Sequence, residues 1–134
     1  MVSERVLIVD DEPEIRRAVR RSLAPAYDVV SADSGEACLE AVRNGFRGLL
    51  LVDIMMPSMS GWEAIQRMAD SGLLEGNTIC ILSGLPDPDE GAGAAKSHVA
   101  RYISKPFDKD GLRAVVAELA ELHASRYQSA TPGE

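Results

Sequence analysis

The stretch VLIVDDEP, residues 6–13, joins four consecutive apolar residues to three acids and a proline. A continuous apolar run of this length is typical of a strand that is buried on both faces of a parallel sheet. The acids that follow would repel one another wherever water is scarce, so something must offset their charge. Proline suits the first turn of a helix, where its missing N–H is not needed. The stretch therefore predicts a buried strand, a charged strand end and the start of a helix.

Four further apolar runs extend this pattern along the chain. They occupy residues 29–30, 49–52, 79–82 and 99–103. Apolar residues at helical spacing fill the segments between them, and Ser34 and Ser60 stand where helix N-caps are expected. Strand and helix alternate five times, which predicts an α/β fold: a doubly wound, five-stranded parallel sheet with five helices and right-handed crossovers.

The segment between the fourth and fifth strands is the weakest helix candidate. Its sequence, GLPDPDEGAGAAKSH at residues 84–98, contains two prolines and three glycines. Each glycine inside a helix costs about 1 kcal/mol relative to alanine. We expect any helix here, at about residues 89–97, to be short or mobile.

Length and composition indicate one globular domain. The chain has 134 residues, too few for two ordinary domains, and we assign residues 1–127 to the domain and 128–134 to a disordered polar tail. No apolar run approaches the roughly 20 residues that span a bilayer, so we expect no membrane insertion. The N-terminus lacks the pattern of a secretory signal, which favours the cytoplasm.

The charge balance limits the choice of partners. Fourteen basic and twenty-one acidic residues give a net charge of −7, which argues against direct binding to nucleic acid. A basic cluster at Arg16, Arg17, Arg20 and Arg21 indicates a solvated helix face, with a docking patch for an acidic partner as the alternative. Two widely separated cysteines, at positions 38 and 80, are expected to be buried free thiols.

Polar side chains follow the apolar runs at the strand ends. They are Asp10, Asp11, Asp53, Ser83 and Lys105. In open α/β sheets the ligand site lies beyond the carboxyl ends of the strands, so these residues are the candidate site. Two like charges 4 Å apart repel by about 4 kcal/mol at an effective dielectric of about 20, and a divalent cation would remove that cost. Oxygen ligands of this kind favour Mg²⁺.

With a cation present, one of these carboxylates can act as a nucleophile toward a phosphoryl group. We assign that role to Asp53, because the third strand is expected to be central in the sheet. Lys105 supplies a mobile positive charge, and the hydroxyl of Ser83 can donate to a phosphoryl oxygen.

Four motifs carry a family resemblance. They are VDDE at residues 9–12, DIMMPSMSG at 53–61, ILSG at 81–84 and RYISKPF at 101–107. Together they make residues 4–123 resemble the receiver domain of two-component response regulators. The resemblance implies a flavodoxin-like three-layer sandwich with strand order 2-1-3-4-5. One departure stands at residues 96–102, KSHVARY, where the family often has an Ala-Gly-Ala-Asp-Asp-Tyr-like run, and it puts the fourth helix in doubt.

The resemblance also implies residue roles at the site. Asp53 would be the phosphoacceptor, Asp11 a direct Mg²⁺ ligand and Asp10 an acid near the metal, often acting through water. The backbone carbonyl of Met55 would complete the protein's share of the coordination, while Lys105 and Ser83 would contact the phosphoryl group. The Lys105-Pro106 bond is expected to be cis. Tyr102 would be the aromatic switch residue that turns inward when Ser83 moves.

The function implied is a phosphorylation-dependent switch. A sensor histidine kinase would supply the phosphoryl group, and output would go to a downstream protein partner, by onward phosphotransfer, or through a domain outside this sequence. Two other functions are open: an interaction module that works without phosphorylation, and a Mg²⁺-dependent phosphohydrolase. The hydrolase usually needs a second acid just after the nucleophile, whereas position 55 is methionine.

We expect Trp62 to pack at the start of the third helix, and His98 and His123 to lie on the surface.

Overall fold

The computed structural model describes residues 4–127 as a five-stranded parallel sheet between two layers of helices. The strands are β1 (Arg5–Val9), β2 (Asp28–Ala32), β3 (Gly48–Asp53), β4 (Asn77–Ser83) and β5 (Val99–Ser104). The helices are α1 (Pro13–Leu23), α2 (Gly35–Arg43), α3 (Gly61–Asp70), the 3₁₀ helix η1 (Gly93–His98) and α4 (Lys109–Tyr127). The strand order is β2-β1-β3-β4-β5, which confirms the predicted fold and order. The tail at residues 128–134 lies outside the described residues.

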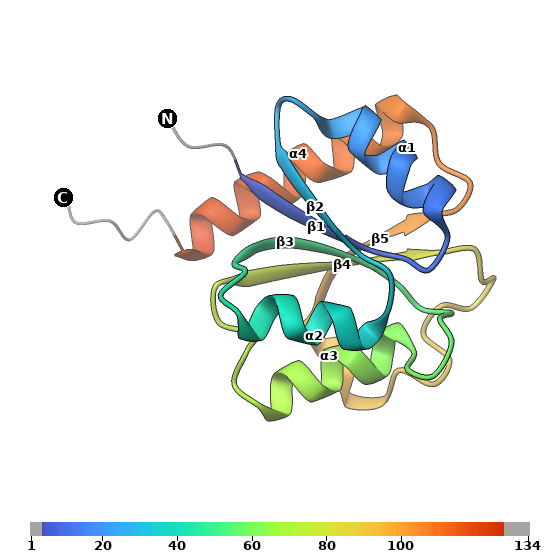
Figure 1. Cartoon of the computed structure of the whole chain (residues 1–134), viewed down its shortest axis with the longest axis vertical. Coiled ribbons are helices and arrows are strands. Elements are labelled where there is room, and N and C mark those ends of the chain that lie inside the picture. The colour runs from blue at the N-terminus through green and yellow to red at the C-terminus, as the bar shows by residue number, and fades with distance from the viewer. Residues whose placement is uncertain (1–3, 128–134) are drawn as a thin grey trace, which may run out of the picture.

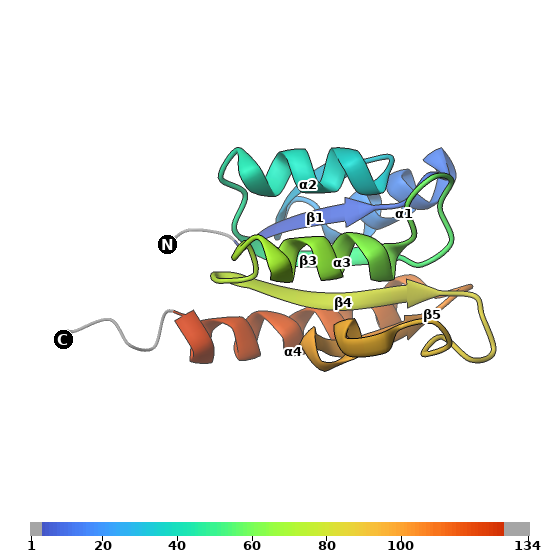
Figure 2. The ribbon, with the colours of Figure 1, turned by 90° about the horizontal axis from the view of Figure 1, so that it is seen from below.

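The two faces of the sheet carry separate cores. Helices α2 and α3 cover one face, and α1 and α4 cover the other (Figures 1 and 2). Along β3, Leu49 and Leu51 point to the α1 and α4 side, while Leu50 and Val52 point to the α2 and α3 side. Every residue of β3 is buried. This double burial explains why the strands read as continuous apolar runs, and it places Asp53 at the end of a central strand.

The helix starts follow the predicted signals. Pro13 occupies the first turn of α1. The hydroxyl of Ser34 accepts a hydrogen bond from the Ala37 amide over 3.0 Å, and the hydroxyl of Ser60 accepts one from the Glu63 amide over 3.1 Å. These N-caps begin α2 and α3 at the carboxyl edge of the sheet, where β1 and β3 end.

Glycine permits a close approach where α3 meets the end of β3. A Cβ atom on Gly61 would lie 2.3 Å from the carbonyl oxygen of Asp53, a distance that side chains do not adopt. The amide of Gly61 donates to the carbonyl of Ile54 over 2.9 Å. The backbone that carries Asp53 therefore packs directly against the first turn of α3.

The segment between β4 and β5 forms no α-helix among the described residues. It folds into turns followed by η1, six residues of 3₁₀ helix. The prediction of a short fourth helix is therefore confirmed, and its cause is the glycine and proline content of the segment. Within residues 4–127, no helix combines the length and the apolar character that crossing a membrane requires.

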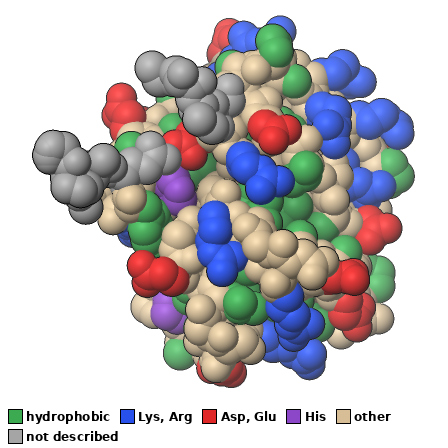
Figure 3. Space-filling view, turned by 60° about the vertical axis from the view of Figure 1, so that its left-hand side comes forward, with side chains coloured by type: hydrophobic (Ala, Val, Ile, Leu, Met, Phe, Trp, Pro, Cys, Tyr) green, Lys and Arg blue, Asp and Glu red, His purple; other side chains and the backbone are tan. Residues whose placement is uncertain are grey.

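The arginine cluster on α1 is partly structural. Arg16 donates to the backbone carbonyl of Asp10 over 2.7 Å, and Arg20 donates to the carbonyl of Val29 over 2.8 Å. On the face drawn in Figure 3, acidic and basic side chains are interspersed with uncharged ones. Both cysteines are buried and free, as predicted.

His123 corrects one prediction, because it is buried and not on the surface. It belongs to the apolar stripe by which α4 packs on the sheet, and only 5% of it is exposed. Its Nδ1 lies 2.9 Å from the Thr78 hydroxyl, and its Nε2 lies 4.0 Å from a carboxylate oxygen of Glu4. Burial lowers the pKa of His123 from 6.5, the charge of Arg126 lowers it further, and Glu4 opposes both. His98, by contrast, is exposed as predicted.

This lowered pKa predicts a pH dependence of stability. The unfolded chain takes up the proton of His123 first as the pH falls, so the free energy of unfolding decreases from about pH 6.5 downward, toward the lower folded-state pKa. We expect His123→Gln, which keeps a polar group near Thr78 but does not titrate, to remove this component. The measurement is urea unfolding of both proteins between pH 7.5 and 5.5. An unchanged difference between the two proteins across this range would contradict the prediction.

Candidate functional site

Three carboxylates meet at the carboxyl edge of the sheet. Asp10 and Asp11 follow β1, Asp53 ends β3, and one carboxylate oxygen from each of the three lies within 4.8 Å of the other two. Asp10 is fully buried and Asp53 is 5% exposed, whereas Asp11 is more open to solvent. The parallel register sets Val9 beside Val52, so the residues that follow these two strands must be neighbours. The structure thus brings together the acids that the sequence placed at strand ends.

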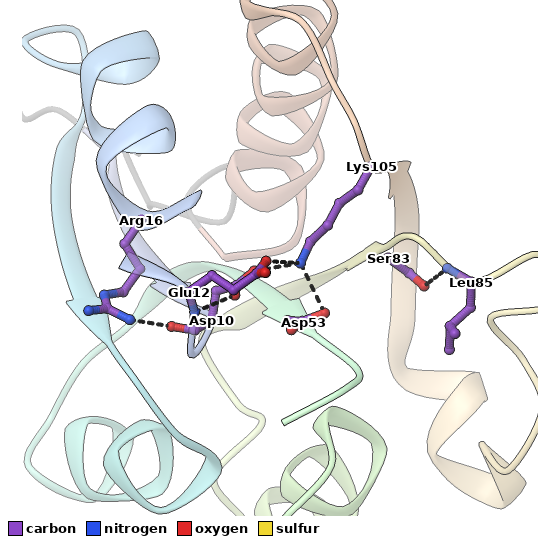
Figure 4. A network of polar contacts seen from close by, with 7 residues as sticks. All are labelled: Asp10, Glu12, Arg16, Asp53, Ser83, Leu85 and Lys105. Atoms are coloured by element: carbon purple, nitrogen blue, oxygen red, sulfur yellow. Dashed lines mark hydrogen bonds and ion pairs between the residues drawn. The ribbon is translucent and has the colours of Figure 1, made fainter. Parts of the chain in front are cut away.

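Lys105 supplies the positive charge that offsets this repulsion. Its Nζ lies 2.8 Å from Oδ2 of Asp10, 3.3 Å from Oδ1 of Asp53 and 3.6 Å from Oε1 of Glu12 (Figure 4). Burial alone would lower the pKa of Lys105, but the hydrogen bond to Asp10 and the charges of Asp53 and Asp10 raise it above its ordinary value. The ammonium therefore stays charged at neutral pH.

The surroundings of Asp53 make its carboxylate unusually basic. Burial and the nearby charge of Asp10 raise its pKa to about 6, against the opposing effects of Lys105 and a hydrogen bond from the Met55 amide. A carboxylate with a pKa just below neutral is mostly ionised at pH 7 and binds a proton or an electrophile more strongly than an ordinary aspartate.

Asp10 is oriented by the backbone around it. Its Oδ1 accepts a hydrogen bond from the Glu12 amide over 2.9 Å. Its buried Oδ2 lies 2.8 Å from the Lys105 ammonium and has no other hydrogen-bond partner among the described residues. A buried carboxylate oxygen with this unused capacity, beside two further carboxylates, fits a hard cation or an ordered water.

The two predicted switch residues lie on neighbouring strands: Ser83 ends β4, and Tyr102 stands two residues before the end of β5. The hydroxyl of Ser83 accepts a hydrogen bond from the Leu85 amide over 2.9 Å and so is bound to its own loop (Figure 4). Tyr102 lies three residues before Lys105 and is 39% exposed, with its hydroxyl bound to Asp89. The Lys105-Pro106 bond is cis, as expected, and the Lys105 amide donates to the Ser83 carbonyl over 2.8 Å.

A family profile described as the response regulator receiver domain matches residues 6–117. The chain belongs to the receiver domain family. Its sequence is 34% identical, over 88% of this chain, to part of the sensor histidine kinase TmoS of Ectopseudomonas mendocina, and it covers 12% of that kinase. The receiver domain spans less than half the length of TmoS and of three other curated relatives that it matches.

Two solved structures show the likeness of the fold. A CheY-like receiver domain protein from Methanospirillum hungatei JF-1 has a TM-score of 0.85 and 36% identity, over 90% of this chain and 97% of that one. The response regulator TrrA of Thermotoga maritima, in complex with Mg²⁺-BeF, has a TM-score of 0.74 and 28% identity, over 87% and 98%.

The sequence did not lead us to place Glu12 or Leu85 in the pocket at the carboxyl edge of the sheet. Glu12 lines this pocket, whose volume is about 270 Å³, and faces Lys105. The other lining residues are Asp11, Asp53, Met55, Gly84, Leu85 and Lys105. The signal was present in the sequence, since Glu12 is the third acid of the run that begins at Asp10.

Proposed function

We propose that this receiver domain is a cytoplasmic switch that accepts a phosphoryl group onto Asp53 from the phosphohistidine of a sensor histidine kinase. The observation that carries the proposal is the position of Asp53. It ends the central strand, opens into the pocket, and lies 3.3 Å from the Lys105 ammonium. Two buried free thiols are consistent with a reducing compartment.

The pocket residues suit the transfer reaction. An oxygen of the ionised Asp53 carboxylate attacks phosphorus, and an O–P bond forms as the N–P bond to the kinase histidine breaks. Lys105 can then move from the carboxylate to an oxygen of the phosphoryl group, because it already contacts Asp53 and its ammonium has three donors. The step balances because Asp53 enters ionised and the histidine ring leaves as neutral imidazole, with the electron pair of the N–P bond on one nitrogen and a proton on the other.

Mg²⁺ is the cofactor that the donor set favours. Carboxylate oxygens of Asp10, Asp11 and Asp53, with the backbone carbonyl of Met55, would hold the ion, which when bound would offset the negative charge of the phosphoryl oxygens. The solved TrrA structure, which contains Mg²⁺-BeF, supports this choice.

After transfer, the phosphorylated form must favour a second arrangement of the domain in order to signal. We propose that Ser83 moves toward the phosphoryl group and that Tyr102 turns inward, so that the surface around β5 changes. The readers of this surface would be a downstream protein or a phosphotransfer protein.

The direct test is chemical phosphorylation of the wild-type protein. Incubation with acetyl phosphate and Mg²⁺ should add one phosphate, detected by intact mass, and a chelator should suppress the addition. The absence of any adduct, under conditions that phosphorylate a known receiver domain, would refute the proposal.

The variant Asp11→Asn tests the metal site separately. Asp11 makes no ion pair with Lys105 among the described contacts, so its charge adds repulsion to the cluster without a pair to lose. We expect Asp11→Asn to weaken Mg²⁺ binding by roughly tenfold or more, and to raise the metal-free unfolding free energy slightly. Calorimetric titration with Mg²⁺ and urea unfolding in chelator measure the two effects. Wild-type Mg²⁺ affinity in this variant would remove Asp11 from the metal site.

A further inference from the structure

One carboxylate outside the pocket holds Tyr102 in its outward position. The Tyr102 hydroxyl donates to Oδ1 of Asp89 over 2.5 Å. The second oxygen of Asp89 lies 3.1 Å from Nζ of Lys96 on η1. A single side chain therefore joins the loop after β4 to η1 and to the edge strand β5.

Asp89 stands on an anchored part of its loop. The indole Nε1 of Trp62, which is buried on α3, donates to the carbonyl of Pro88 over 2.9 Å. The carbonyl of Asp89 itself accepts from the Ala92 amide over 2.9 Å. These bonds fix the backbone on both sides of the carboxylate, so Asp89 offers Tyr102 a positioned acceptor.

The electrostatics of the pair agree with a charge-assisted hydrogen bond. Burial, the hydrogen bond to Asp89 and its charge raise the pKa of Tyr102 to about 12. The hydrogen bonds from Tyr102 and Lys96 in turn lower the pKa of Asp89. Hydrogen bonds between a hydroxyl and an ionised carboxylate are stronger than neutral ones.

The pair is connected to the phosphorylation site through β4. Tyr102 is paired with Ile81, two residues before Ser83, and the Ser83 hydroxyl binds the Leu85 amide at the start of the loop that carries Asp89. Tyr102 cannot turn toward Ser83 while its hydroxyl remains on Asp89. The glycine-rich segment at residues 84–98, which forms no α-helix, thus supplies a specific contact from Asp89 to Tyr102.

We propose that Asp89 is a positioning residue, a latch that holds Tyr102 outward and opposes the phosphorylated arrangement. The proposal rests on the proposed function, because it assumes that Tyr102 turns inward when Asp53 is modified. Breaking the latch should shift the unmodified protein toward the active arrangement and strengthen any ligand that selects it.

The test compares Asp89→Ala with Asp87→Ala. Asp87 is an exposed acid of the same loop, and the Tyr102 hydroxyl bonds to Asp89 and not to Asp87, so this control matches the loss of charge. The probe is beryllofluoride with Mg²⁺, the additive in the TrrA structure, titrated against the fluorescence of Trp62. Trp62 is the only tryptophan, and its ring centroid lies 6.4 Å from that of Tyr102. We expect about three- to tenfold tighter binding for Asp89→Ala, the size of one hydrogen bond, and no change for Asp87→Ala.

A double-mutant cycle with Tyr102→Phe separates the latch from a general effect on the loop. Tyr102→Phe should tighten beryllofluoride binding by a similar factor, and adding Asp89→Ala to it should change nothing further. In Asp89→Ala the Tyr102 phenol should also titrate closer to its ordinary pKa of 10. If Asp89→Ala binds like the wild type, or still tightens binding in the Tyr102→Phe protein, the latch is wrong. If the wild type itself does not bind beryllofluoride, the phosphorylation proposal fails, and the latch fails with it.

Discussion

The variant Asp53→Asn should gain no phosphate from acetyl phosphate and Mg²⁺ under conditions in which the wild type gains one. The amide has nearly the shape of the carboxylate but is not a nucleophile toward phosphorus. The fold should be retained and the metal-free protein stabilised, because the ionised Asp53 is opposed by burial and by Asp10. Its pKa of about 6, a value that already includes the pairing with Lys105, corresponds to a gain of up to about 3 kcal/mol in unfolding free energy at pH 7.

The matched control is Asp33→Asn. Asp33 is an exposed acid that follows β2, so it lies at the same edge of the sheet but outside the pocket. This variant should be phosphorylated like the wild type. An adduct of wild-type amount on Asp53→Asn would show that another residue is the acceptor, and fragmentation of the modified protein would locate it.

The strand ends could be predicted because one physical rule governs them. Continuous apolar runs such as residues 49–52 require burial on both faces, which requires a parallel sheet, and a parallel sheet collects the residues after its strands at one edge. Asp10, Asp53 and Lys105 meet for this reason. The site could therefore be assembled from residues far apart in the sequence.

His123 shows a signal that was present but not used. It stands four residues after Leu119, which stands three after Val116 and seven after Leu112, so it continues the buried stripe of α4. A polar residue on such a stripe needs a buried partner, and the chain provides one in Thr78. The partner lies 45 residues away, so only the packing of α4 against β4 could identify it.

The charge balance within the pocket and the position of Tyr102 could not be predicted from the sequence, for a different reason. The repulsion among the acids was expected to be relieved mainly by a cation, whereas the Lys105 ammonium already reaches Asp10 and Asp53. Side-chain rotamers of this kind depend on competing partners, and Asp89 carries no local pattern that reveals which lysine or tyrosine it will bind.

Lys105→Ala should be the most destabilising of the proposed pocket substitutions in the absence of Mg²⁺. The lysine side chain is 16% exposed, and it contacts the fully buried Asp10 as well as Asp53. Removing one partner of a buried ion pair leaves an uncompensated charge and typically costs about 3–5 kcal/mol. The expected result is a loss of this size in unfolding free energy at pH 7 in chelator, measured by urea denaturation. Lys109→Ala, an exposed lysine at the start of α4, should cost little.

Two further measurements identify electrostatics as the cause. Saturating Mg²⁺ should restore much of the stability of Lys105→Ala, because a cation held by the acids would replace the missing positive charge. Adding Asp10→Asn should restore it without metal, because the buried charge that Lys105 neutralised is then gone. A loss of stability that neither Mg²⁺ nor Asp10→Asn reverses would instead assign the effect to the packing of the lysine's aliphatic chain. Recovery by both would show that one buried positive charge, from lysine or from metal, is what the three acids require.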